Sequence, residues 1–169
     1  MKVIVCGAGQ VGAQIANHLS LEKNDITVID SNSDLVGQLT NTLDISGITG
    51  CASHPDVLES AGARDCDMVI ATTQSDETNM IICQVSHSVF TIPRKIARIR
   101  SQSYLEINYS DLYQSEHLPI DVIISPEKEV AEAVISRLEI PCAFEIETCL
   151  LYTSPSPRDR SVSRMPSSA

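Results

Sequence analysis

Three glycines in the pattern Gly-x-Gly-x-x-Gly constrain this chain more than any other feature. Gly7, Gly9 and Gly12 come directly after an apolar run at residues 2–6 and directly before a helical pattern at residues 10–19. In a strand–turn–helix unit, the first glycine allows a tight turn, the second lets a pyrophosphate approach the backbone, and the third lets the helix pack close to the strand. The free amides at the helix start then hold the phosphates. We therefore predict a nucleotide site here, rather than a chance glycine-rich turn.

The second apolar run ends in a carboxylate. Residues 26–29 lead into Asp30, which lies 18 residues after Gly12. An acidic side chain at this place accepts hydrogen bonds from the adenosine ribose hydroxyls, and it repels a 2′-phosphate. No arginine follows, because the next residues are Ser31, Asn32 and Ser33. The pattern favours NAD(H) or a plain adenine nucleotide over NADP(H); the alternative is a solvent-exposed aspartate in a loop.

Short apolar runs alternate with helical patterns from residue 2 to about residue 138. The expected strands cover residues 2–6, 26–29, 45–49, 68–72, 95–99 and 121–124, and the expected helices cover residues 10–19, 33 onward, 55–61, 76–89, 102–113 and 126–138. We expect the Ser33 hydroxyl to cap the second helix. Continuous apolar strands joined by helices indicate a parallel sheet covered on both faces. The sequence thus predicts an α/β fold, a Rossmann-like doubly wound parallel sheet of about six strands with helices on both faces.

The last part of the chain has a different composition. Residues 153–169 are rich in Ser and Pro and hold three Arg, with almost no apolar residue to offset the entropy of ordering. The run from Leu151 to Arg160 resembles translated adapter or vector sequence. We expect residues 1–140 to form the nucleotide-binding domain with a crossover helix from Pro126, and residues 141–169 to be a truncated remainder with a disordered, non-native tail.

Polar residues near two further strand ends are candidates for the same site. Thr72, Thr73 and Gln74 end the fourth strand, on the side where open α/β sheets bind ligands. They line a pocket beside the ribose and phosphates, cap the helix that begins at Asp76, or do both. Arg98 lies among apolar residues of the fifth strand, which is costly unless its charge is paired. A bound phosphate and a structural salt bridge are the two candidate partners.

Composition limits the kinds of partner. The net charge is −10, from 12 basic and 22 acidic residues, and such a surface repels nucleic acid and anionic lipid. The apolar runs are too short to span a bilayer, and we see no signal peptide. Six cysteines without CxxC spacing predict reduced, mostly buried thiols. The four histidines are scattered, so we expect no metal site.

These residues carry a resemblance to a known family. The matching segments are Lys2–Gly12, Asn24–Asp30, Gly50–Pro55, Ser75–Met80, Ile96–Arg100, Pro119–Asp121 and Ile124–Glu127. In them the chain resembles the N-terminal TrkA-N domain of Trk-type potassium uptake proteins, one of the RCK or KTN regulatory domains. The resemblance places the nucleotide contacts at Gly7, Ala8, Gly9, Gln10, Val11, Asp30, Thr73, Gln74 and Arg98.

The resemblance implies a cytoplasmic regulatory subunit that binds NAD(H), with ATP or ADP as further candidates. Such domains form homo-oligomers on the inner face of the plasma membrane beneath a membrane-embedded potassium transporter, and nucleotide state gates ion flow. Family members continue into a C-terminal subdomain, which this chain lacks in recognisable form. For this chain we therefore expect ligand binding, whereas coupling to the transporter and full assembly do not follow from the resemblance.

Two other functions are alternatives to the regulatory one for a chain with this motif. An NAD-dependent oxidoreductase needs a second domain to hold its substrate and a general acid or base, and residues 139–169 are too few for that domain. His54 is the nearest candidate for an acid or base, but its place before Pro55 favours a role at a helix start. A purely structural oligomerisation domain is the third possibility. We expect a regulatory binding module that is not an enzyme.

Overall fold

A computed structural model describes residues 1–106, 111–113, 117–126, 130–131 and 134–136. The chain divides into two compact units, Met1–Pro126 and Glu127–Ala169. The first unit contains the whole sheet. Residues 126, 130–131 and 134–136 are helical, as expected for the helix at 126–138, whose other residues lie outside the described ones. The predicted boundary at residue 140 and the predicted tail also lie outside them.

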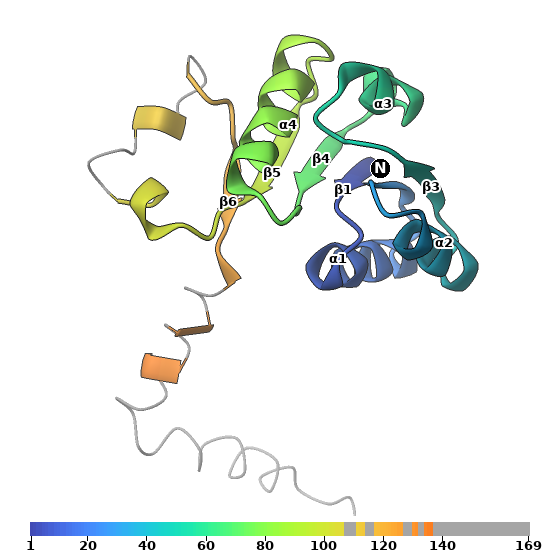
Figure 1. The fold of residues 1–169 in the computed structure, drawn as a ribbon, viewed down its shortest axis with the longest axis horizontal. Helices are drawn as coiled ribbons and strands as arrows, with labels where there is room; N and C mark the ends of the chain where they lie inside the picture. The colour runs from blue at the N-terminus through green and yellow to red at the C-terminus, as the bar shows by residue number, and fades with distance from the viewer. Residues whose placement is uncertain (107–110, 114–116, 127–129, 132–133, 137–169) are drawn as a thin grey trace, which may run out of the picture. The chain divides into compact units, whose positions relative to one another are not determined.

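Six parallel strands form one sheet (Figure 1). They are β1 Lys2–Cys6, β2 Asp25–Asp30, β3 Ser46–Thr49, β4 Met68–Ala71, β5 Arg94–Arg98 and β6 Val122–Ile124. The spatial order is β3-β2-β1-β4-β5-β6, so the direction in which the chain adds strands reverses between β1 and β4. At the centre, Val5 pairs with Val28 on one side and Ile70 on the other. This confirms the predicted doubly wound sheet.

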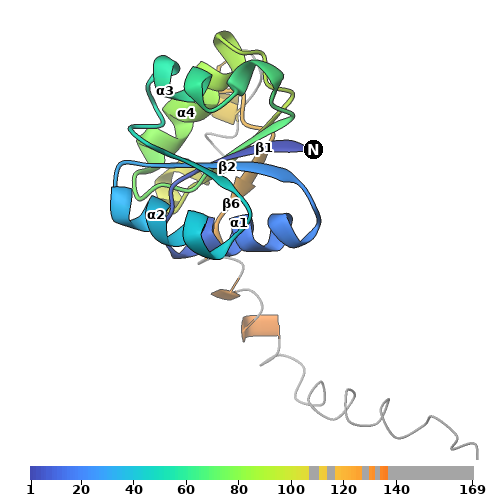
Figure 2. The same ribbon diagram turned by 90° about the vertical axis from the view of Figure 1, so that its right-hand side faces the viewer.

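Helices cover both faces of the sheet, as Figure 2 shows. They are α1 Gln10–Leu21, α2 Ser33–Thr42, α3 Pro55–Ser60 and α4 Asp76–Ser88, with a 3₁₀ turn, η1, at Ala63–Asp65. Alternate residues of each strand point to opposite faces. Val3 and Val5 therefore pack with Ala16 of α1, whereas Ile4 and Cys6 belong to a second core that includes residues of α3 and α4.

Two local predictions were wrong. The described part of the range 102–113, where the sequence predicts a helix, has a 3₁₀ turn, η2, at Gln102–Tyr104, then two bend residues, and again 3₁₀ residues at 111–113, whereas residues 107–110 lie outside the described ones. The segment is rich in Ser, Asn, Asp and Tyr, whose helix propensity is modest. The cap of α2 is Asn32 rather than Ser33, because the Asn32 side chain accepts hydrogen bonds from the amides of Asp34 and Leu35.

Candidate functional site

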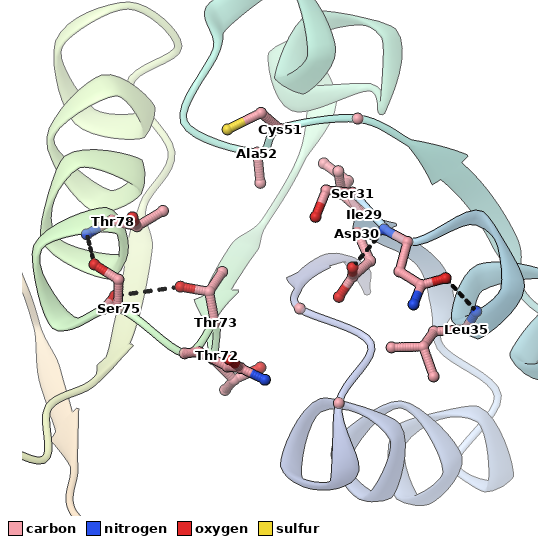
Figure 3. A pocket seen from close by; sticks show the side chains of 15 residues that line it. Ile29, Asp30, Ser31, Leu35, Cys51, Ala52, Thr72, Thr73, Ser75 and Thr78 are labelled. Atoms are coloured by element: carbon pink, nitrogen blue, oxygen red, sulfur yellow. Dashed lines mark hydrogen bonds between the residues drawn. The ribbon is translucent and has the colours of Figure 1, made fainter.

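A cavity of about 460 Å³ opens at the carboxyl ends of β1, β2 and β4, where the strand order reverses (Figure 3). This is where open α/β sheets bind ligands. Thr72 and Thr73 lie across the cavity from Asp30 and Ser31 (Figure 3). The lining residues are Gly7, Gly9, Ile29, Asp30, Ser31, Asn32, Leu35, Gly50, Cys51, Ala52, Thr72, Thr73, Gln74, Ser75 and Thr78.

The glycine turn after β1 forms the floor between the two sides. Gly7 has a φ of +109°, and a Cβ there would lie 2.9 Å from the carbonyl of Thr72. A Cβ at Gly12 would overlap the carbonyl oxygen of Gly7. A Cβ at Gly9 would meet nothing within 4 Å. Gly7 and Gly12 are therefore needed by the fold itself, whereas Gly9 leaves open space where a ligand can approach.

The start of α1 supplies backbone donors beside that space. Gly9 is the N-cap residue and offers no side-chain hydrogen bond, and the first intrahelical bond runs from the amide of Ala13 to the carbonyl of Gly9. The amides of Gln10, Val11 and Gly12 precede that bond, so they belong to the turn whose N–H groups have no partner within the helix. With the positive end of the helix dipole, such a turn suits an anion.

Asp30 joins two turns through its carboxylate. One oxygen, Oδ2, accepts a hydrogen bond of 2.6 Å from the amide of Ala8, and the other, Oδ1, accepts one of 2.8 Å from the amide of Asn32. The side chain is half-buried and lines the cavity, unlike the exposed loop aspartate of the alternative interpretation. Each oxygen keeps a lone pair for a ribose hydroxyl. The Ala8 amide, by contrast, is already used by Asp30.

The residues after β4 line the cavity, but their hydroxyls have protein partners. Thr72 donates to the carbonyl of Cys6 at 3.2 Å, and Thr73 Oγ1 lies 2.7 Å from Asn79 Oδ1 and 3.2 Å from the carbonyl of Ser75. The cap of α4 is Ser75, whose hydroxyl accepts from the amide of Thr78. The alternative that Thr72–Gln74 cap this helix is therefore wrong.

Other predicted contacts lie beside the cavity rather than on its wall. Ala8, Gln10, Val11, Gly12 and Arg98 are not among the lining residues. The first four form the turn and helix start just described, and Arg98 ends β5, the strand beyond β4. Their contact with a ligand stays a prediction.

Sequence reasoning missed one wall of the cavity and one buried residue behind it. Leu35, Gly50, Cys51 and Ala52 line the side next to Asp30, and only their place after β2 and β3 could have indicated them. Asn79 is 0% exposed and holds Thr73. Its signal was a polar residue on the helix face that also carries the buried Ile82 and Ser86.

The ionisable groups in and around the cavity differ in charge and in burial. Asp30 is the one charged side chain among the described residues that line the cavity. Cys51 is an exposed free thiol at the wall, whereas burial raises the pKa of the thiols of Cys6, Cys66 and Cys83. At the start of α4, the Glu77 backbone amide and the Ser75 hydroxyl lower the pKa of the Glu77 carboxyl. Over the described ranges, no group of three or more Cys, His, Asp or Glu could hold a metal ion.

Comparison with known proteins identifies relatives of this chain. The model of the TrkA-N domain family matches residues 3–126. The Trk system potassium uptake protein TrkA of Azorhizobium caulinodans is 49% identical over 145 residues, which are 86% of this chain and 32% of that protein. That of Halomonas elongata is 47% identical over 146 residues, again 86% of this chain and 32% of that protein. The chain thus spans about a third of the length of the curated relatives it matches.

Solved structures agree with this fold. The TrkA-N domain of the inner membrane protein ybaL from Escherichia coli superposes with a TM-score of 0.70 at 18% identity, covering 81% of this chain and 96% of that one. The GsuK channel bound to NAD superposes with a TM-score of 0.55 at 17% identity, covering 61% of this chain and 18% of that one. No helix in the described part of this chain has the length and hydropathy required to cross a membrane.

Proposed function

The chain belongs to the TrkA-N domain family, and from this we propose that it is the nucleotide-binding domain of a regulatory subunit of a potassium uptake system. It has no chemistry of its own. The relatives named as Trk system potassium uptake proteins support this role, although the chain spans only 32% of their length. The subunit acts on the cytoplasmic face of the membrane, as a homo-oligomer bound to an integral-membrane potassium transporter.

The ligand of the cavity is NAD(H), with ADP and ATP as the competing candidates. One observation carries the proposal: the start of α1, whose first amides have no partner within the helix, follows the glycine turn that Asp30 holds through the amide of Ala8, at the reversal point of the sheet. The diphosphate approaches over Gly9 and is held by these amides, while Asp30 accepts hydrogen bonds from the adenosine ribose. The NAD bound to the GsuK channel, which shares the fold, supports this assignment.

Regulation follows from the parts of the chain that the ligand would touch. The cavity wall comes from the loops after β1, β2, β3 and β4, so an occupant bridges both halves of the sheet. A ligand stabilises whichever arrangement of these loops it binds best, by the difference between its affinities. We propose that nucleotide binding gates potassium flow by favouring one such arrangement.

An experiment on glycines separates binding from folding. Gly9→Ala is expected to raise the Kd for NADH at least about tenfold, because a methyl group would occupy the open space where the diphosphate approaches. The stability of the fold is not expected to fall, since a Cβ at Gly9 meets nothing within 4 Å. Isothermal titration calorimetry with NADH, NAD, ADP and ATP gives the affinities, and urea denaturation gives the free energy of unfolding.

Gly37→Ala is the matched control, because it also adds a Cβ in open space but lies on α2 and does not line the cavity. It should bind every ligand as the unsubstituted chain does. Silence of the unsubstituted chain towards all four nucleotides would contradict the proposal and favour a structural oligomerisation domain. Turnover of NADH with a panel of small hydroxy and keto acids would instead favour the oxidoreductase alternative.

A further inference from the structure

Asn79, in the first turn of α4, uses all of its hydrogen-bonding capacity on two other segments. Its Oδ1 accepts from the amide of Thr73 at 2.8 Å and from the hydroxyl of Thr73 at 2.7 Å. Its Nδ2 donates to the carbonyl of Thr73 at 3.3 Å and to the carbonyl of Arg98 at 2.8 Å. An asparagine side chain has two donors and two acceptor sites, so each of them is satisfied.

This network is fully buried, so each of its hydrogen bonds has to be made within the protein. Asn79 is 0% exposed, so water cannot replace any partner that it loses. The network also fixes the orientation of the amide, because a flipped side chain would set its NH₂ group against the amide of Thr73. Thr73, which lines the cavity, is thus held at its N–H, its C=O and its hydroxyl by one side chain that does not line the cavity.

The first turn of α4 is itself anchored, so Asn79 is a fixed support. The Asp76 carboxylate, on the same turn, accepts hydrogen bonds from the amides of Arg100 at 2.9 Å and Ser101 at 2.8 Å. The Ser75 hydroxyl caps the helix. Asn79 and Asp76 therefore bind the loop after β4 and the segment that leaves β5 to one helical turn.

We propose that Asn79 is a positioning residue of the nucleotide site, which sets the loop of Thr72–Gln74 for the half of a dinucleotide that lies beyond the diphosphate. The proposal rests on the function proposed above. Asp30 and its apolar neighbours Ile29, Leu35 and Ala52 lie on the other side of the cavity and suit the adenosine half. Asn79 contacts none of them through a hydrogen bond, so its effect falls on the half of the ligand next to Thr73.

The test compares a ligand that reaches Thr73 with one that does not. NADH extends across the cavity, whereas AMP carries only the half that Asp30 binds. In the full chain with Asn79→Ala, the Kd for NADH is expected to rise at least about tenfold while the Kd for AMP stays within about twofold. Ile82→Ala is the control, because Ile82 is equally buried on α4 but does not line the cavity. It should lower stability and leave both Kd values unchanged.

The possible results distinguish a failure of the positioning role of Asn79 from a failure of the proposed function. Equal losses for both ligands, or no loss for either, would overturn the positioning role while leaving the nucleotide site in place. Failure of the unsubstituted chain to bind NADH or AMP would instead overturn the proposed function. If Asn79→Ala does not fold, amide hydrogen exchange of the unsubstituted chain decides the matter. NADH should then protect the Thr73 amide further and AMP should not, and equal protection by the two ligands would contradict the proposal.

Discussion

At the scale of single residues, the candidate site depends on side chains that hold its loops in place through hydrogen bonds to the backbone. The Asp30 carboxylate holds the turns after β1 and β2 through the amides of Ala8 and Asn32. Asn79 holds Thr73 in the same way. The sequence could predict Asp30, because its spacing from the glycine motif follows a known pattern. It could not predict the partners of Asn79, because Thr73 and Arg98 meet it only after β4 and β5 have paired.

Replacing Asp30 should therefore remove both ribose recognition and support for the glycine turn. Asp30→Ala is expected to weaken NADH binding by about 1–3 kcal/mol, the usual effect of losing hydrogen bonds to a charged group. Calorimetry with ADP and with 2′,3′-dideoxy-ADP separates the two contributions. The unsubstituted chain should bind ADP more tightly than the dideoxy ligand, and Asp30→Ala should bind the two alike. A preference for ADP that survives the substitution would show that Asp30 does not bind the ribose.

The buried thiol of Cys83 gives the stability of the fold a pH dependence. Burial raises the pKa of Cys83 from its ordinary value of 9.0 to about 12. A pKa that is higher in the folded state stabilises the fold fully below 9.0, and this contribution is lost as pH rises towards 12. Between about pH 7.5 and 10.5 the loss from this group is about 2 kcal/mol.

Urea denaturation at the two pH values measures this loss. The free energy of unfolding should fall with pH, and it should fall by about 2 kcal/mol less in Cys83→Ala. Cys66, whose pKa is raised mainly by its own burial, is present in both chains and cancels in the comparison. Burial is also the main cause of the raised pKa of Cys6, to which Cys83 adds a smaller part. An identical fall in the two chains would mean that Cys83 ionises in the folded state as readily as in the unfolded chain.

At the scale of helices and strands, the elements with strong apolar periodicity could be predicted and the weakly patterned ones could not. All six strands lie within one or two residues of their expected ends. The apolar runs of β1, β2, β4 and β5 contain fully buried residues, whereas the edge strands β3 and β6 are exposed or half-buried and are marked by shorter apolar runs. Residues 102–106 lack such a pattern and form a 3₁₀ turn and bends. Asn32 and Ser33 are neighbours of which either could cap α2, and only the structure shows that the Asn32 side chain accepts from the amides of Asp34 and Leu35.

The packing of α1 against the sheet gives a prediction at this scale. Gly12→Ala is expected to destabilise the fold by about 3 kcal/mol, because the new Cβ would overlap the carbonyl oxygen of Gly7 and lie 2.9 Å from the Thr72 hydroxyl. The Gly7 oxygen is part of the backbone of the turn and the Thr72 hydroxyl adjoins it, so neither atom can move without displacing the turn. In urea denaturation, Gly37→Ala should instead gain about 0.5–1 kcal/mol from the higher helix propensity of alanine. Equal stability of the two variants would contradict the close approach of α1 to the turn.

At the scale of the whole molecule, the fold and family were predictable while the regulatory context was not. The order β3-β2-β1-β4-β5-β6 and the TrkA-N match over residues 3–126 confirm the expected class and family. The proposed assembly and coupling to a transporter rest on relatives of which this chain spans 32%. The residues of this chain therefore define the candidate site, whereas the proposed partner rests on the comparison with relatives.

The first compact unit should be sufficient for binding. Among the described residues, all those that line the cavity lie between Gly7 and Thr78, and the unit ends at Pro126. A chain of residues 1–126 is therefore expected to bind NADH with a Kd within about twofold of the full chain. Calorimetry on both chains measures this, with circular dichroism to establish that the shorter one is folded. A folded 1–126 chain without affinity would mean that residues after Pro126 complete the site.

The adjacency of β1 and β4 has a mechanical consequence. The boundary between these two neighbouring strands separates β1–β3, which come first in the chain, from β4–β6, which come later. In the function proposed above, a nucleotide at the carboxyl ends of β1 and β4 would contact loops on both sides of this boundary and so resist their separation. Nucleotide concentration would then set the stiffness of the sheet along the boundary between β1 and β4, without any strand changing its place.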